Sequence, residues 1–309
     1  MRGAFVRTLG ELADRDPRVM LLTADLGFMA LEPFKDRHPD RFVNVGVAEQ
    51  NMVGVACGLA EAGYFPFVYS IATFASMRAY EFIRNGVVLH ELPVRIVGVG
   101  GGFEYGSAGP THHSIEDVAL MRTQPNLTVI APADHLQTRT AILATWDLPG
   151  PVYYRLGKDD RAVVPGLDAR FELGRLAVVG DGADLLLLSM GSVSVEAEAA
   201  ARLLAAQGLM CTLAVVACIN PVPESDLLEV LSRFPVAITV EAHQARGGLG
   251  SLVAEVIADH GIACRLVRCG VTGAPTSLSG SQEYLHRRYG LDREGLVKTA
   301  LKTVSGTLA

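Results

Sequence analysis

The sequence predicts an α/β protein with two doubly wound sheet domains, and three observations support this fold class. Short apolar runs alternate with helix-length segments along the chain. Hydrophobic residues make up 50% and charged residues 19% of the 309 residues, which is enough apolar surface for two cores and excludes wholesale disorder. Strands that alternate with helices favour parallel sheets covered by helices on both faces.

The first half of the chain begins with the apolar run Val19–Leu26, which Asp25 and Gly27 close. Such a run is typical of a buried strand that ends at a functional edge. Four similar runs predict further strands at Phe65–Tyr69, Val94–Gly98, Leu127–Ile130 and Val152–Leu156. The segments between them predict helices at Ala48–Ala62, Phe74–Leu89, Ser114–Met121 and His135–Trp146.

A second α/β alternation follows in the other half of the chain. We expect strands at Asp184–Met190, Leu213–Val216, Ala237–Glu241 and Arg265–Cys269. We expect helices at Val193–Gln207 and Ser251–His260. The segment 158–174 between the halves is charged, contains Pro165 and Gly166, and lacks helical periodicity. We therefore set the domains at residues 1–165 and 166–309.

Composition excludes several classes of function. The formal net charge of -6 and the lack of any basic run argue against a nucleic-acid-binding protein. The apolar stretches are too short for a membrane span, and the first twenty residues carry charges where a signal peptide needs an apolar core. Five cysteines without zinc spacing favour reduced thiols. We expect a cytoplasmic protein that holds no metal on its own residues.

A glycine-rich loop at Gly98–Gly109 leads into His112, His113 and Glu116. So many glycines let the backbone approach a ligand or let a loop move. Adjacent histidines in an extended segment point to opposite faces, so both cannot readily bind one metal ion together with Glu116. We expect one imidazole to face a cleft and the other to pack or to cap the following helix.

The predicted helix at Ala48–Ala62 carries a carboxylate at its start. Glu49 lies on the same helical face as Val53, Ala56 and Ala60, which are small and apolar. An ordinary first-turn glutamate is favoured by the helix dipole, but burial favours the neutral acid. If burial dominates, Glu49 is a carboxyl group that can donate a hydrogen bond, which is a catalytic property.

Several blocks of sequence, in this order, resemble those of the transketolase family. The resemblance covers essentially the whole chain and is greatest for the separate C-terminal subunit of split bacterial transketolases. The blocks are TADLG (23–27), NVGVAEQN (44–51), TFASMRAYEFIRN (73–85), GSAGPTHHSIED (106–117), PVYYRLGK (151–158), TVEAH (239–243), GGLGS (247–251) and YLHRRYGL (284–291).

The resemblance implies a pyrimidine-binding domain followed by the smaller C-terminal domain of the family, with thiamine diphosphate as cofactor. Glu49 matches the glutamate that hydrogen-bonds the pyrimidine ring and so promotes loss of the thiazolium proton. Phe74 matches the aromatic residue that stacks on the pyrimidine, although it could be a core aromatic. Asp25 matches a position that contacts the cofactor, although it could be a simple turn residue.

The family's pyrophosphate domain carries GDG and, about 25 to 30 residues later, an asparagine that helps to hold Mg²⁺ and the diphosphate. Here Gly180, Asp181 and Gly182 spell GDG, but the next asparagine is Asn220. A diphosphate needs a metal or several donors. We therefore expect a partner chain, an N-terminal transketolase subunit, to supply that domain and its Mg²⁺ ligands. We expect activity only when the two kinds of chain combine, in an α2β2 assembly.

Family members transfer a two-carbon ketol unit from a ketose phosphate to an aldehyde acceptor. His112 matches a catalytic histidine that contacts the donor hydroxyls, and Arg155 matches an arginine that binds the substrate anion, with a structural salt bridge as the alternative. Ala108 replaces an acid of the family's GEDGPTHQ loop. Gly100 and Met29 stand where the sugar enzymes of the family have a phosphate-binding histidine and serine, whereas Arg155 is kept. The resemblance therefore implies that a sulfonated, branched or carrier-bound acceptor is as plausible as an ordinary sugar phosphate.

Three other interpretations stay open at this point. The chain could be the beta subunit of a 2-oxo-acid dehydrogenase first component, which shares the architecture, although GPTHH is closer to transketolase. It could be a noncatalytic partner subunit, against which the retention of Glu49, Phe74 and His112 argues. A metal hydrolase that uses His112, His113 and Glu116 is the third.

Overall fold

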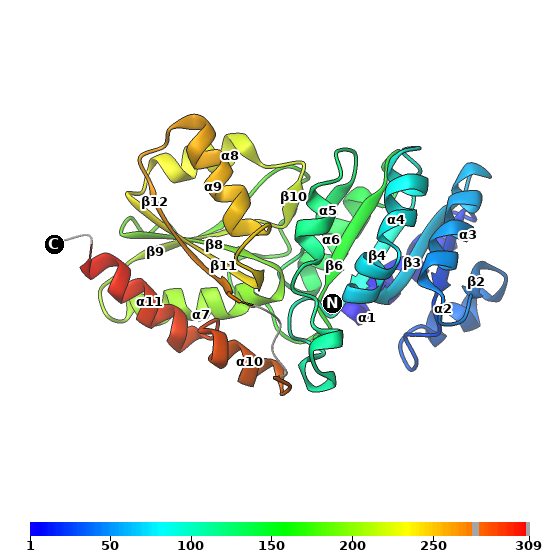
Figure 1. The fold of residues 1–309 in the computed structure, drawn as a ribbon, viewed down its shortest axis with the longest axis horizontal. Helices are drawn as coiled ribbons and strands as arrows, with labels where there is room; N and C mark the ends of the chain where they lie inside the picture. The colour runs from blue at the N-terminus through cyan, green and yellow to red at the C-terminus, as the bar shows by residue number, and fades with distance from the viewer. Residues whose placement is uncertain (274–277, 307–309) are drawn as a thin grey trace.

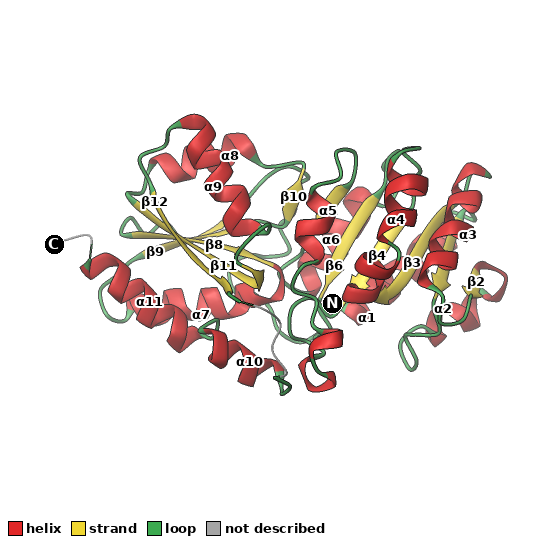
Figure 2. Cartoon of the chain, viewed as in Figure 1, coloured by secondary structure: helices red, strands yellow, loops and turns green. Residues whose placement is uncertain are grey.

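The computed structural model describes residues 1–273 and 278–306, which form two α/β units side by side (Figure 1). Helices cover both faces of each central sheet (Figure 2). The expectation of two α/β sheet domains is confirmed. No helix in these two ranges combines the length and the apolar character that crossing a bilayer requires.

The first sheet has seven strands within the described residues, in the order β10-β5-β6-β4-β3-β1-β2. Neighbouring strands are parallel except β10, which is antiparallel to β5. The central strands are buried on both faces, as their continuous apolar runs require. The strands are β1 (Val19–Thr23), β2 (Phe42–Asn44), β3 (Phe65–Ile71), β4 (Arg95–Val99), β5 (Thr128–Ile130), β6 (Val152–Leu156) and β10 (Cys218–Asn220).

The second sheet has five strands among the described residues, in the order β12-β11-β8-β9-β7. Four of them are parallel, and the edge strand β7 is antiparallel to β9. The strands are β7 (Ala177–Val179), β8 (Leu185–Met190), β9 (Cys211–Val215), β11 (Val236–Gln244) and β12 (Arg265–Val271).

Helices from distant parts of the chain pack on the faces of these sheets. One face of the first sheet is covered by α1 (Arg2–Arg15), α2 (Glu32–Arg37) and α6 (His135–Thr145). The other face is covered by α3 (Glu49–Glu61), the segment 74–88 and α5 (Asp117–Arg122). On the second sheet, α8 (Glu224–Ser232) and α9 (Leu249–His260) lie opposite α7 (Ser194–Ala205), α10 (Gln282–Tyr289) and α11 (Arg293–Ser305).

The core of α3 and the segment 74–88 continues without a break into the core beneath α8 and α9. Short strand β10 lies in the second half of the chain but belongs to the first sheet, because Cys218 pairs with Ile130. The two units are therefore joined by a shared core and by a strand. A boundary near residue 165 separates the main part of each sheet but leaves β10 on the far side.

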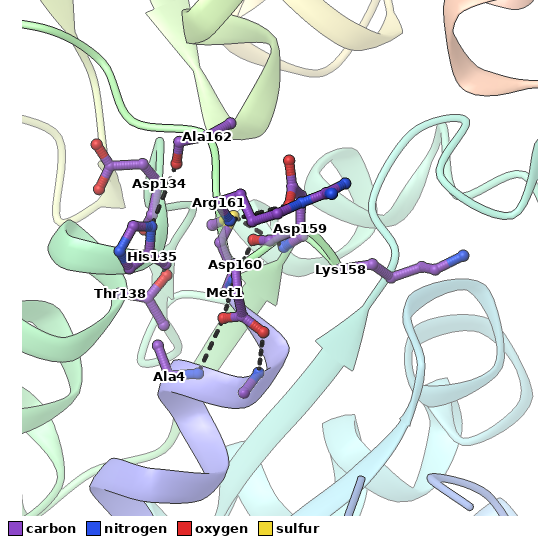
Figure 3. Close-up of polar contacts among 12 residues, drawn as sticks. Met1, Ala4, Asp134, His135, Thr138, Lys158, Asp159, Asp160, Arg161 and Ala162 are labelled. Carbon is purple, nitrogen blue, oxygen red and sulfur yellow. Dashed lines mark hydrogen bonds and ion pairs between the residues drawn. The ribbon is translucent and has the colours of Figure 1, made fainter. Parts of the chain in front are cut away.

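Asp160, in the loop after β6, caps the first helix from a distance in sequence (Figure 3). Its carboxylate accepts hydrogen bonds from the backbone N–H groups of Gly3 (2.7 Å) and Ala4 (3.0 Å) and pairs with the Met1 ammonium at 2.6 Å. A carboxylate at a helix N-terminus satisfies unpaired N–H groups and interacts favourably with the helix dipole. This contact fixes α1 beside the loop that leads into the second domain.

The expected helix at Phe74–Leu89 is wider and less regular than the sequence predicts. It consists of a π-helical turn at Phe74–Arg78 (η2), a short α-helix α4 at Tyr80–Phe82 and a second π-helical segment at Ile83–Val88 (η3). π-Helical turns are often found at functional sites. The other expected helices and strands are present, with ends that shift by a few residues.

Candidate functional site

Glu49 is the first residue of α3 and is only 3% exposed. The Ser70 hydroxyl on β3 donates to its carboxylate at 3.3 Å. Nη1 of Arg78 lies 3.3 Å from both of its carboxylate oxygens. The predicted burial of Glu49 is therefore confirmed, and its carboxyl group has both a hydrogen-bond donor and a cationic neighbour, as buried carboxyl groups require.

Phe74 and Arg78 lie on the π-helical turn η2 that follows β3. The guanidinium carbon of Arg78 lies 3.8 Å from the centroid of the Phe74 ring, within the range of a cation–π contact. The His112 ring meets Phe74 edge-on, with 5.0 Å between ring centroids. The structure thus brings together three residues that the sequence predicts to be functional, Glu49, Phe74 and His112, and places Arg78 between the first two.

Two cavities open at this cluster. One, of about 610 Å³, is lined by Thr73, Phe74, Met77, Arg78, Pro110, Thr111, His112, His113 and Glu116. The other, of about 410 Å³, is lined by Val47, Ala48, Glu49, Gln50 and Arg78. Arg78 lines both cavities and separates Glu49 from Phe74 and His112.

The two adjacent histidines have different surroundings, as predicted. His112 is partly exposed at the cleft, and its Nδ1 lies 3.0 Å from the Thr111 hydroxyl. His113 is buried edge-on against Phe103, with its Nε2 3.4 Å from the carbonyl oxygen of Gly106, and burial lowers its pKa. His112 is therefore the histidine that is available to a ligand, and His113 holds the glycine-rich loop.

Glu116 lines the same cleft as His112 and Phe74. Burial raises the pKa of its carboxyl above the ordinary value, since the charged form loses hydration. A carboxyl group in this position can accept or donate a proton or bind a sugar hydroxyl. The sequence pattern suggested Glu116 only as part of a metal site.

Asp25 lies at the end of β1, where its backbone adopts a left-handed conformation with φ of 56°. Its carboxylate accepts a hydrogen bond from Nδ2 of Asn44 at 2.9 Å, and its backbone N–H donates to Oδ1 of Asn44 at 3.0 Å. The side chain is exposed and lines neither of the two cavities. Its contacts here are those of a turn residue that ties β1 to β2.

Arg155 is buried on β6 and bonds to both domains. It is 3% exposed, and its guanidinium pairs with Asp117 at 2.9 Å and donates to the carbonyl oxygens of Ser114 and Ala242 at 3.0 and 2.9 Å. Ala242 belongs to the second domain. In this structure Arg155 makes the contacts of the alternative role, a structural salt bridge that joins the domains, through its Nε and Nη2 atoms.

Next to this junction, the TVEAH block forms a buried polar cluster at the end of β11. The Glu241 carboxylate accepts hydrogen bonds from the backbone N–H groups of Leu249 and Gly250 at the start of α9, both at 2.8 Å. His243 lies 3.7 Å from Glu241, and its Nε2 accepts a hydrogen bond from the N–H of Ala119 in the first domain. Burial raises the pKa of Glu241 to about 7 and lowers the pKa of His243 to about 4.

The described residues were also compared with the arrangements of side chains that bind metal ions. Residues 1–273 and 278–306 contain no group of three or more histidine, cysteine or acidic side chains arranged to hold a metal ion. The GDG sequence at 180–182 lies in the turn between β7 and β8 of the second sheet, away from the cleft at Phe74.

The sequence matches two family models that together cover most of the chain. Residues 1–161 match the pyrimidine binding domain of transketolase, and residues 174–296 match the transketolase C-terminal domain. The chain belongs to the transketolase family.

Related proteins fit this membership. The chain is 35% identical to one subunit of the apulose-4-phosphate transketolase from Phocaeicola vulgatus, over 98% of this chain and 97% of that protein. It is 34% identical to a 6-deoxy-6-sulfo-D-fructose transketolase subunit from a Clostridium species, over 97% and 93% of the two chains. The solved structure of a split gene transketolase, in the form of an inactive beta4 tetramer, superposes with a TM-score of 0.87, at 35% identity and 98% and 97% coverage.

The sequence prediction missed Arg78, which contacts both Glu49 and Phe74. Arg78 follows Phe74 by four residues, and this spacing puts two side chains on the same face of a helix. The sequence therefore contained two signals: the spacing of Phe74 and Arg78, and a predicted buried glutamate, Glu49, that needs a cationic partner. What the sequence could not provide was the position of α3 relative to this turn, which depends on how both pack on β3.

Proposed function

We propose that this chain is the subunit of a two-chain transketolase that carries the catalytic glutamate. The enzyme would transfer a two-carbon ketol unit from a ketose phosphate to an aldehyde acceptor with thiamine diphosphate as cofactor. In this proposal Glu49 hydrogen-bonds the pyrimidine ring, Phe74 supports the ring face, and His112 contacts the hydroxyls of the sugar and moves protons. Bound there, the cofactor supplies the carbanion chemistry, and this chain supplies positioning and proton donation.

The observation that carries the proposal is the burial of Glu49, which Arg78 links to Phe74 and His112. The carboxyl group of Glu49 is 3% exposed and can hydrogen-bond the edge of a polar heterocycle. Across Arg78 from it, the Phe74 ring and the partly exposed His112 imidazole offer a surface for the face of the same heterocycle. Removal of a preorganised donor of this kind costs about 10²- to 10³-fold in turnover.

We also propose that a partner chain supplies the pyrophosphate-binding domain and the Mg²⁺ ligands, in an α2β2 assembly. Phe28, Met29 and Val47 are 86%, 84% and 73% exposed, on the two loops that carry Asp25 and precede Glu49. Large apolar side chains gathered at one edge are typical of a protein interface. The related split gene transketolase, which is inactive as a tetramer of beta chains, supports the same dependence on a second kind of chain.

The substrate is proposed only as a class. Two relatives are named for different sugars, apulose 4-phosphate and a sulfonated fructose. These names support a ketose donor whose group at the end remote from the ketone varies between family members.

The test is reconstitution of the chain with the N-terminal transketolase chain from the same genome. Wild type should convert a ketose phosphate and an aldehyde only when thiamine diphosphate, Mg²⁺ and both chains are present. Glu49→Gln keeps an N–H donor but cannot exchange a proton with the ring, and should lower turnover by about 10²-fold or more. Glu61→Gln, at the exposed far end of the same helix, serves as the matched control and should retain activity. Turnover by the lone chain, or no effect of Glu49→Gln, would contradict the proposal.

A parallel assay with pyruvate and other 2-oxo acids separates the proposed reaction from that of a 2-oxo-acid dehydrogenase component. Decarboxylation of a 2-oxo acid without ketol transfer would favour the dehydrogenase.

A further inference from the structure

Arg78 makes with Glu49 and Phe74 the two kinds of contact that an aminopyrimidine ring would make. Its Nη1 is 3.3 Å from both carboxylate oxygens of Glu49, and its guanidinium carbon is 3.8 Å from the centroid of Phe74. A guanidinium is planar, stacks on aromatic faces and donates hydrogen bonds in its own plane. It therefore lies where a planar ligand of both residues would have to lie.

The cavities on either side of Arg78 support this interpretation of its position. Glu49 lines one cavity and Phe74 and His112 line the other, while Arg78 lines both. A ring in contact with Glu49 and Phe74 at once would have to extend across the boundary between the two cavities. That boundary is the Arg78 side chain.

We propose that Arg78 is a gate on the pyrimidine site, which we define as the surfaces of Glu49 and Phe74. Its guanidinium must swing away from both residues before a pyrimidine ring can contact them, and the two cavities then join into one. This inference rests on the proposed use of thiamine diphosphate and adds a step that regulates access to the site.

The side chain has the freedom to make this movement. The Arg78 side chain is 49% exposed, and its guanidinium is hydrogen-bonded to Glu49. An ion pair with one half-exposed partner is weaker than a buried one. The helix backbone at Arg78 does not have to change, because rotation within the long arginine side chain is sufficient.

A closed gate lowers the apparent affinity for the cofactor in proportion to the fraction of molecules in which the gate is open. If the open form is about one molecule in ten, removal of the guanidinium tightens binding about tenfold. Cofactor affinity therefore tests the gate independently of catalytic activity.

The experiment is calorimetric titration of thiamine diphosphate, with Mg²⁺, into the reconstituted two-chain complex. The variants are Arg78→Met, which keeps a long apolar stem without the guanidinium, and Arg84→Met as the control. Arg84 is an exposed arginine on the neighbouring turn whose side chain bonds Asn85. We expect Arg78→Met to bind the cofactor about tenfold more tightly than wild type and Arg84→Met to match wild type.

Unchanged or weaker binding by Arg78→Met, with wild-type binding intact, would overturn the gate and leave the proposed function standing. Failure of the wild-type complex to bind thiamine diphosphate would overturn the proposed function, and the gate with it. If Arg78→Met does not assemble, Arg78→Lys decides the question. Lysine retains the charge but not the planar stacking group. The Arg78→Lys complex should therefore bind thiamine diphosphate more tightly than wild type, but by less than about tenfold. Binding equal to or weaker than that of wild type would overturn the gate.

Discussion

The guanidinium of Arg155 lies 2.9 Å from the carboxylate of Asp117, and both side chains are buried where α5 and β6 meet the second domain. The same carboxylate oxygen accepts a hydrogen bond from the Tyr153 hydroxyl at 2.7 Å. Arg155 also donates to the carbonyl oxygen of Ala242 on β11. One buried ion pair thus connects the glycine-rich loop region, the first sheet and the second sheet.

Arg155→Met should destabilise the chain by about 3 to 5 kcal/mol, because it leaves the charge of Asp117 buried without a partner. Urea unfolding followed by circular dichroism measures this free energy. Arg18→Met removes an exposed ion pair with Asp16 and should cost less than about 1 kcal/mol. Equal effects of the two substitutions would contradict a structural role for Arg155.

A pair of variants at the junction should reveal two opposing pH dependences. The folded-state pKa of Glu241, about 7, is above its ordinary value of 4.5, so its contribution to stability is full below pH 4.5 and is lost as the pH rises through 7. The pKa of His243, about 4, is below its ordinary value of 6.5, so its contribution is full above pH 6.5 and is lost as the pH falls through 4.

Between pH 4.5 and 6.5 the contributions of Glu241 and His243 change in opposite directions and largely offset each other in the wild type. Glu241→Gln should leave a free energy of unfolding that rises with pH over this range by roughly 3 kcal/mol. His243→Gln should leave one that falls with pH by a similar amount. Urea unfolding at pH steps from about 4 to about 8 measures the free energy of unfolding of the wild type and both variants. If the three profiles have the same slope with pH, the opposing contributions of Glu241 and His243 are contradicted.

The two histidines of the GPTHH block should respond differently to substitution. His112→Asn should lower turnover of the two-chain enzyme by about 10²-fold or more without loss of stability, because His112 is at the cleft and bonds the neighbouring Thr111. His113→Asn should mainly lower the melting temperature, because His113 packs on Phe103 and bonds Gly106. Steady-state kinetics and thermal unfolding of both variants check the contrast.

Two glycine substitutions test packing on opposite sides of the molecule. A Cβ at Gly248 would clash with the Glu241 carboxylate and lie 2.7 Å from Nδ1 of His243, so Gly248→Ala should destabilise by about 1 to 3 kcal/mol. A Cβ at Gly58 meets nothing within 4 Å among the described residues, and Gly58→Ala in the interior of α3 should stabilise by about 0.5 to 1 kcal/mol. Thermal unfolding of both variants should show a lower melting temperature for Gly248→Ala and a higher one for Gly58→Ala.

Much of the fold was predictable because apolar runs in buried parallel strands are strong signals. The burial of Glu49 was also predictable, since Val53, Ala56 and Ala60 mark the buried face of its helix. The contacts of Arg155 were not, because an arginine near the end of a strand can bridge two domains or bind a substrate anion, and only the packing of β6 against the second domain shows which contacts it makes. The π-helical turn at Phe74–Arg78 also has no sequence signature, since it depends on packing against β3 and α5.

Strand β10 has a consequence for any attempt to dissect the protein. A fragment cut at residue 165 would lose Cys218–Asn220 and so expose the edge of β5, where unpaired backbone groups recruit strands from other molecules. Such a fragment would also expose the part of the shared core that α8 and α9 cover, so expression of the N-terminal half alone should yield aggregates. Gene fusions, domain swaps between relatives and deletion studies therefore need to keep residues 1–220 contiguous.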